Sequence, residues 1–243
     1  VRAMSKLLHA DNNRMLRSRV FRLGMASLAA LVLLTFALEG DAGILKRTES
    51  GFQGLLLFLP MVCSFIIILY VGHEFAGGAI RNKLIVGHLR SRVYTSWMVV
   101  GIGVTVIAMI FSAAMLAAMC AIDGGMGKLA AKPLITVWTV LLCELLSNAA
   151  MSLLFAVILP GAKGAVVSFL YQYALLMVFM ISMDGGGIGW IKTLSHFFPQ
   201  GLMGVAALQR APEKPWLYML CSLGAAVAFY GVGMYSFRRK DLN

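Results

Sequence analysis

The stretch GLLLFLPMVCSFIIILYVG, residues 54–72, decides the fold, because it runs for 19 residues without a single charge. A helix of roughly 20 apolar residues crosses the ~30 Å hydrocarbon core of a bilayer. Six apolar stretches of this kind follow one another along the chain, at residues 21–38, 52–72, 97–122, 134–159, 165–183 and 216–237. None shows a strand-like alternation, so the sequence predicts an all-α integral membrane protein with six transmembrane helices.

The loop charges predict the orientation of these spans. The N-terminal arm, the loops after the second and fourth spans and the C-terminal tail carry 14 Lys+Arg and 3 Asp+Glu, whereas the other loops carry 7 and 6. Basic loops stay on the cytoplasmic side during insertion, so both termini are expected in the cytoplasm. The net charge of +11 then describes a basic surface facing anionic lipid, and no nucleic-acid partner is expected.

The composition leaves no room for a soluble catalytic domain, because 60% of the 243 residues are hydrophobic and 13% are charged. The four cysteines lie in four different spans without paired spacing, which predicts no metal site. His73-Glu74 has no second histidine at helical spacing, and Ser195-His196 does not form a nucleophile elbow. We therefore do not expect the chain to be an enzyme by itself.

Three further segments complete the predicted organisation. Residues 1–20 are expected to form a basic cytoplasmic arm in which Leu8 and Met15 share one side of a helix. This pattern is typical of an amphipathic helix on the lipid surface, and the basic residues also suit a simple orientation signal. The transmembrane domain covers residues 21–237, and residues 238–243 form a cytoplasmic tail. The outer connection 184–215 is apolar but interrupted by Pro199, so it is expected to be re-entrant between spans five and six.

The loop 73–96 between spans two and three carries the richest pattern. Gly77-Gly78 is expected to break the descending helix, and Gly87 to stop a helix of two turns over residues 79–86. Ile80, Leu84 and Val86 are placed on one side of this helix, with Arg81, Asn82 and Lys83 on another, and Ser91 is expected to cap the next span. A short amphipathic helix at the membrane surface suits docking into a groove of a partner. Glu74 either positions this loop or pairs with Arg81 or Arg92.

The run EFAGGAIRNKLIVG, residues 74–87, followed by RVY at 92–94, resembles the signature loop of type-2 ABC transporter permeases, with Ala79 where that family commonly has threonine. The resemblance covers the whole layout of the chain and implies a membrane subunit of an exporter. It further implies that residues 78–87 are a coupling helix contacting a separate ATPase, supported by Glu74 and Arg92. The ATPase-coupling residues are Gly78, Ala79, Ile80, Arg81, Asn82, Lys83, Leu84, Ile85, Val86 and Gly87.

The partners implied by the resemblance are two copies of an ATP-binding subunit and a second permease chain, identical or different. ATP and Mg²⁺ belong to the ATPase and no cofactor to this chain, and the location implied is a bacterial cytoplasmic membrane. The sequence agrees that nucleotide chemistry lies elsewhere, since Gly124-Gly-Met-Gly-Lys128 is followed by Leu129 rather than by the hydroxyl residue of a phosphate-binding loop. The breadth of the family favours a hydrophobic peptide, antibiotic or drug as cargo.

Glu144 is an acid within the fourth span, where an ionised carboxylate is costly, so it is expected to face the bundle interior. Ser147, Asn148 and Ser152 extend it into a polar stripe at helical spacing, and span five offers a smaller stripe from Ser168, Tyr171 and Gln172. Two interpretations stay open: the stripe lines the translocation path, or a protonated Glu144 bonds Asn148 or a neighbouring helix. The alternative function is a secondary carrier driven by an ion gradient, with Glu144 as its proton or ion site.

Overall fold

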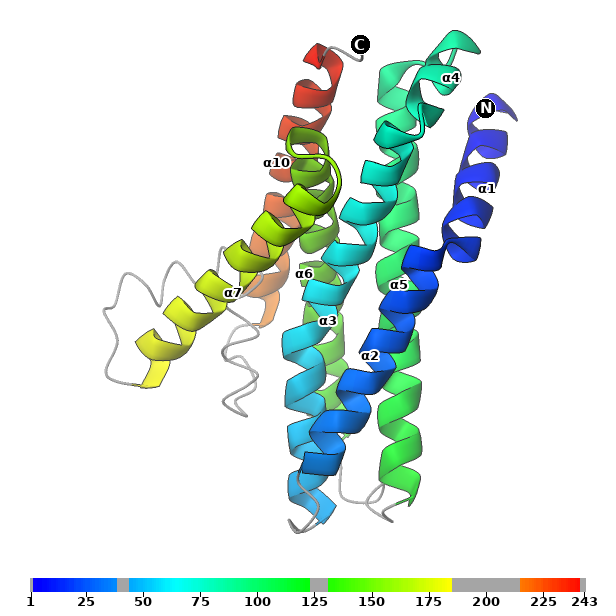
Figure 1. Ribbon diagram of the computed structural model, residues 1–243. Coiled ribbons are helices and arrows are strands. Elements are labelled where there is room, and N and C mark those ends of the chain that lie inside the picture. Colours follow the sequence, from blue (N-terminus) through cyan, green and yellow to red (C-terminus); the bar gives the residue numbers. More distant parts are fainter. Residues whose placement is uncertain (1, 39–43, 123–130, 185–214, 241–243) are drawn as a thin grey trace.

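The computed structural model describes residues 2–38, 44–122, 131–184 and 215–240, and the regular elements in these ranges are all helices. Figure 1 shows them as a bundle of long, roughly aligned rods with both ends of the chain at the same end of the bundle. The helices are α1 (Arg2–Arg17), α2 (Arg19–Leu38), α3 (Ile44–Ala76), α4 (Ala79–Ile85), α5 (Arg90–Ile122), α6 (Ala131–Ile158), α7 (Ala162–Asp184) and α10 (Pro215–Arg239).

Four of these helices contain segments that are long and apolar enough to cross a membrane, which makes this a helical membrane protein. The segments are Phe58–Ala76 in α3, Arg90–Ala118 in α5, Ile135–Ile158 in α6 and Pro215–Arg239 in α10. They correspond to the second, third, fourth and sixth predicted spans. Helices α2 and α7 cover the positions of the first and fifth.

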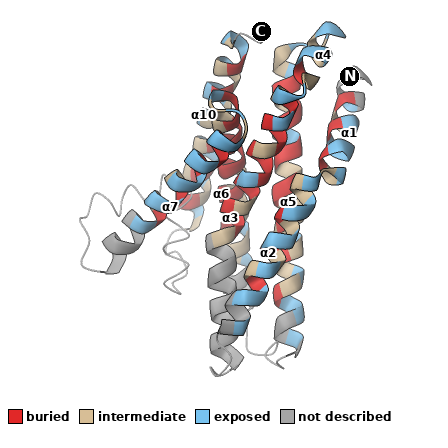
Figure 2. Ribbon diagram, viewed as in Figure 1, coloured by how far each residue is buried: buried red, intermediate tan, exposed pale blue. Residues whose placement is uncertain are grey.

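The core of the bundle lies among α3, α5 and α6. Helix α2 packs along α3, α10 packs along α6, and α7 leans away from the bundle axis (Figure 1). Figure 2 shows exposed residues along α2 and α7 and buried ones along the inner helices. The main apolar cluster includes Met15 of α1, Ile66 of α3, Trp97 of α5, Leu153 of α6 and Phe237 of α10, and Ile80 of α4 and Ala165 of α7 also belong to it. Apolar side chains that remain exposed on the outer helices suit contact with lipid.

Helix α1 packs beside α5 at the end of the bundle that carries α4 (Figure 1). Its buried residues Leu7, Asp11 and Met15 recur every four positions and form one stripe against the bundle. The chain then breaks at Ser18, whose Oγ accepts a hydrogen bond of 3.1 Å from the Phe21 amide and caps α2. The structure therefore gives the apolar side of the N-terminal arm, including Met15, a place in the protein's own core.

The predicted short helix is present as α4, between two glycines with positive φ. Gly78 has φ 66° and Gly87 has φ 93°, conformations that side chains with a Cβ rarely adopt. Helix α5 begins at Arg90, and the Leu89 carbonyl accepts the amides of Arg92 and Val93. Ser91 thus lies within the first turn of α5, and the prediction that it caps this helix is wrong.

Two predicted segments lie outside the described residues. Almost all of the re-entrant connection 184–215 falls there, and so do the last three residues of the tail, 241–243.

The backbone of α3 approaches the turn after α6 closely at Gly72. A Cβ added to Gly72 would lie 2.4 Å from the backbone nitrogen of Gly161, which itself has φ 85°. Side chains cannot relieve a contact between two backbones, so this position requires glycine.

We expect Gly72→Ala to destabilise the folded protein by about 1–3 kcal/mol, because α3 and the Gly161 turn must separate to admit the methyl group. Gly224→Ala in α10 is the matched control, since no atom of the described residues outside its own stretch of helix lies within 4 Å of its added Cβ. The control should leave stability unchanged or raise it by up to about 1 kcal/mol. The stability of each variant is measured as the apparent unfolding midpoint of the purified full chain in detergent. Equal midpoints for Gly72→Ala and Gly224→Ala would contradict the packing argument.

Candidate functional site: a charged junction between four helices

Glu74 lies in the last turn of α3, directly before the glycine pair, and its side chain is only 3% exposed. Its Oε2 accepts hydrogen bonds from Lys83 Nζ at 2.6 Å and from Trp97 Nε1 at 2.8 Å. Its Oε1 accepts one from an Arg14 guanidinium nitrogen at 3.2 Å. A buried carboxylate is stable only with such partners, and here they come from α4, α5 and α1.

Asp11 in α1 is the second buried acid of this region. Its Oδ1 lies 2.8 Å from Lys83 Nζ, and its Oδ2 accepts a hydrogen bond of 2.7 Å from Ser96 Oγ. The Tyr70 hydroxyl donates to the Asp11 carbonyl at 3.1 Å. Lys83 therefore bridges two acids from different helices. We call the whole set the charged junction, and its members are Asp11, Arg14, Tyr70, Glu74, Lys83, Ser96 and Trp97.

The charged junction contains two acids and two bases, so its formal charges balance. Lys83 is 10% exposed, whereas Arg14 is 59% exposed and contacts Glu74 from the rim. Removing the charges of Asp11, Glu74 and Lys83 from water costs several kcal/mol per ion, and the contacts among these charges offset that cost. Removing one member would leave the others without compensation, so the geometry makes the four helices depend on each other at this point.

The structure corrects the partners expected for Glu74. Sequence proximity indicated Arg81 or Arg92, but the carboxylate meets Lys83 and Arg14 instead, while Arg81 and Arg92 are exposed. The reason is that α4 turns its Lys83 inward, and α1 packs beside α5 in a position from which its Arg14 reaches the end of α3. Lys83 was expected on the same side of α4 as Arg81 and Asn82, but its side chain is only 10% exposed whereas those two residues are exposed.

The apolar residues of α4 and the turn after it divide into two groups. Ile80 is 2% exposed, and the partly buried Leu84 packs against the same core. Ile85, Val86 and Leu89 are 74%, 78% and 57% exposed, and we call these three the apolar tip. Val86 was expected beside Ile80, but it lies past the end of α4 and points away from the core. One side of α4 is therefore anchored, and its far end presents apolar surface.

A second set of contacts ties α10 to the same end of the bundle. An Arg90 guanidinium nitrogen donates to the carbonyls of Arg238 and Lys240, both at 2.8 Å, and so caps the end of α10. Lys240 Nζ donates to the Val157 carbonyl at the end of α6, and burial lowers the pKa of this ammonium group. The Phe237 ring packs against the ring of Trp97, a residue of the charged junction, with 5.1 Å between the ring centroids.

The predicted polar stripe of α6 is buried in the structure. Ser64 in α3 is its centre, because its Oγ lies 2.9 Å from Asn148 Nδ2, 2.8 Å from Ser152 Oγ and 2.9 Å from Gln172 Nε2. Asn148 Nδ2 also donates to the Pro60 carbonyl at 2.9 Å. These bonds join α3, α6 and α7 through side-chain amides and hydroxyls, a form of contact that links helices within a bilayer.

Glu144 stands apart from this polar centre. Its side chain is buried, and neither carboxyl oxygen has a hydrogen-bond partner among the residues the structure describes. The bond from Glu144 to Asn148, which one of the two open interpretations offered, is not formed, since Asn148 uses its amide nitrogen on α3. Ser147 is likewise buried with an unpartnered hydroxyl. Whether Glu144, Ser147, Asn148 and Ser152 line a translocation path stays a prediction.

No protein-family model matches the sequence, and a search of curated proteins finds no match either. Within the described ranges, no group of three His, Cys, Asp or Glu residues could hold a metal ion.

Asp11, Arg14, Tyr70 and Trp97 belong to the charged junction but were missed in the sequence. A signal for Asp11 exists, because it shares the four-residue spacing of Leu7 and Met15 and so places an acid within an apolar stripe. An acid at such a position needs a buried cation nearby.

We expect Glu74→Gln to lower the free energy of unfolding by about 3 kcal/mol, because it leaves Lys83 and Arg14 with one carboxylate fewer. Glu144→Gln is the matched control: the same change at a buried acid that has no described partner. Unfolding midpoints of the full-length variants in detergent test the difference, and equal losses in both would contradict a special role for Glu74.

Proposed function

We propose that this chain is the membrane permease subunit of an ATP-driven exporter, with six transmembrane helices and both termini in the cytoplasm. The observation that carries the proposal is the apolar tip, which is exposed at the end of a short helix whose other side is fixed to the bundle. A soluble protein that covers this tip supplies the energy, and its chemistry is ATP hydrolysis. The resemblance of residues 74–87 to type-2 ABC permeases supports the same assignment.

The surroundings of the tip describe the surface that it fits. Ile85, Val86 and Leu89 are apolar, and Arg81 and Arg92 are exposed on either side of them in the sequence. A complementary partner therefore offers an apolar groove with an acidic rim. Such a groove would bind the end of α4 in the way that hydrophobic grooves of other proteins bind amphipathic helices.

The charged junction gives α4 a path for transmitting movement. Lys83 of α4 is fixed to Glu74 of α3 and to Asp11 of α1, and Trp97 of α5 completes the contact. A displacement of the tip would thus move the ends of α3 and α5 together, and both helices are candidate spans. Alternation between inward-open and outward-open forms needs a second permease chain and two ATPase copies in this scheme. The proposed cargo class is a hydrophobic peptide, antibiotic or drug.

We expect Val86→Asp to weaken association with the ATPase about ten-fold or more, because it places a charge in the centre of an apolar contact. Asn12→Asp, which adds the same charge on the exposed face of α1, should leave association unchanged. The tagged chain is purified from its native membrane, and ATP hydrolysis in the purified fraction is measured. Equal hydrolysis with both variants, or none with the unaltered chain, would overturn the proposal.

A second candidate function is a carrier driven by an ion gradient, and the unpartnered Glu144 carboxyl favours it. Buried acids within spans commonly mark proton or ion pathways. The two functions differ in their energy source: transport by a carrier stops when an uncoupler removes the gradient, whereas transport by the exporter stops when ATP is removed.

We expect Glu144→Gln to alter cargo-stimulated ATP hydrolysis or transport while assembly with the ATPase stays intact. The change keeps the shape of the side chain and removes only its ability to ionise. Transport and hydrolysis in vesicles, compared with the amount of ATPase retained, measure the two effects separately. Unchanged export by the folded variant would exclude Glu144 from the translocation path.

A further inference from the structure

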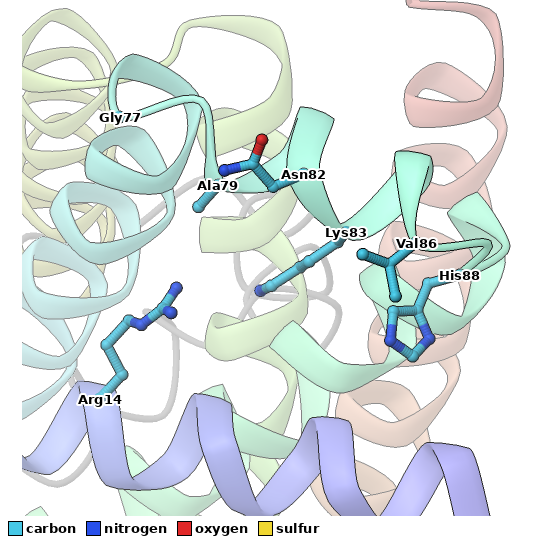
Figure 3. A pocket seen from close by; sticks show the side chains of 7 residues that line it. All are labelled: Arg14, Gly77, Ala79, Asn82, Lys83, Val86 and His88. Atoms are coloured by element: carbon cyan, nitrogen blue, oxygen red, sulfur yellow. The ribbon is translucent and has the colours of Figure 1, made fainter.

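An open cavity of about 460 Å³ lies between α1 and α4. Its lining residues are Arg14, Gly77, Ala79, Asn82, Lys83, Val86 and His88. Figure 3 shows the side chains of Arg14 and Lys83 reaching toward one another from α1 and α4, with Asn82 on the wall above and His88 at the far side. The volume falls in the range of small-ligand sites, ~300–1,000 Å³.

The polar side chains of this lining are hydrogen-bond donors of a kind that suits an anion. Arg14 and Lys83 are cationic, Asn82 brings an amide, and His88 a ring nitrogen. No carboxylate is among the lining residues, because Glu74 and Asp11 are buried behind Lys83. One guanidinium nitrogen of Arg14 donates a hydrogen bond to Glu74, yet the Arg14 side chain is 59% exposed and so can bind a second anion.

The position of the cavity indicates where its ligand comes from. The apolar segment Phe58–Ala76 ends beside the cavity and the segment Arg90–Ala118 begins beside it, so in a bilayer that these segments cross the cavity would lie at the depth of the lipid headgroups. Basic pockets at this depth bind anionic lipid headgroups. The exposed Arg14 guanidinium matches the oxygen atoms of a phosphate, which Arg binds in a forked geometry, whereas the Lys83 ammonium beside it is already held by Glu74 and Asp11.

We propose that this cavity binds a phosphate group, supplied by the headgroup of an anionic lipid. The phosphate would lie between Arg14 and Asn82 and would compete with Glu74 for the Arg14 guanidinium. Binding would therefore loosen one contact of the charged junction and leave the Lys83 contacts in place. The membrane's content of anionic lipid would in this way adjust how firmly α1 is held to α3. This site does not depend on an ATPase partner.

The competing occupant is an acidic side chain of a soluble partner. The lipid is favoured because the cavity adjoins the ends of two apolar spans. Of the apolar tip that suits a protein, only Val86 lines the cavity, whereas Ile85 and Leu89 do not.

The test uses the full chain, extracted from vesicles of phosphatidylcholine and phosphatidic acid, and native mass spectrometry of the lipids that remain bound. Asn82→Asp places a carboxylate in the lining without touching the charged junction, and we expect it to lower retention of phosphatidic acid about five-fold. Asn12→Asp adds the same charge on α1 outside the lining and should leave retention unchanged. Arg14→Gln should lower it as Asn82→Asp does.

A parallel arm distinguishes the sources of the phosphate. If inorganic phosphate in excess displaces phosphatidic acid from the unaltered chain but not from Asn82→Asp, the site accepts free phosphate as well as lipid. Equal retention in Asn82→Asp and Asn12→Asp, or no preference for phosphatidic acid over phosphatidylcholine, overturns the proposal. So does a result in which Asn82→Asp changes only association with a soluble protein.

Discussion

The fold at one end of the bundle depends on a carboxylate that has been removed from water. Glu74 is nearly inaccessible, and its two oxygens accept hydrogen bonds from Arg14, Lys83 and Trp97, which belong to three other helices. An ionised group in such a place is destabilising unless every contact is made. The charged junction therefore fixes where α1 and α4 must lie, and apolar packing alone, which is tolerant of sliding, would not do so.

This constraint explains why α4 can be both short and rigid. Seven residues are too few to form a stable helix in isolation. Ile80 anchors α4 in the core and Lys83 bonds two acids, while Gly78 and Gly87 end it on both sides through positive φ. A helix held in this way keeps its exposed tip in a fixed position relative to α3 and α5. A fixed tip is what a mechanical contact with a soluble partner would need.

The features that could be predicted from the sequence are those set by local signals. Hydropathy located the four helices that are able to cross a membrane, and the Gly77-Gly78 pair with Gly87 located α4. The partners of Glu74 could not be predicted, because Arg14 lies 60 residues away and is brought near only by the packing of α1. Glu144 was rightly placed in the interior, but the bonds of Asn148 go to α3 instead. The direction of a polar side chain depends on which helices become neighbours, and one sequence does not contain that information.

The two buried acids of the transmembrane helices illustrate different physical solutions. Glu74 lies at the end of a span, where Arg14 of α1 and Lys83 of α4 can reach it with positive charge. Glu144 lies inside α6, and the donor groups of Asn148, Ser152 and Gln172 are engaged around Ser64 instead. An ionised carboxyl is costly in the interior of a bilayer, and that of Glu144 has no partner among the residues that the structure describes. The polar centre around Ser64 holds α3, α6 and α7 together without Glu144, so packing of these helices gives no reason for an acid at this position. A proton, an ion, a cargo molecule or a second chain that meets the carboxyl would each supply such a reason.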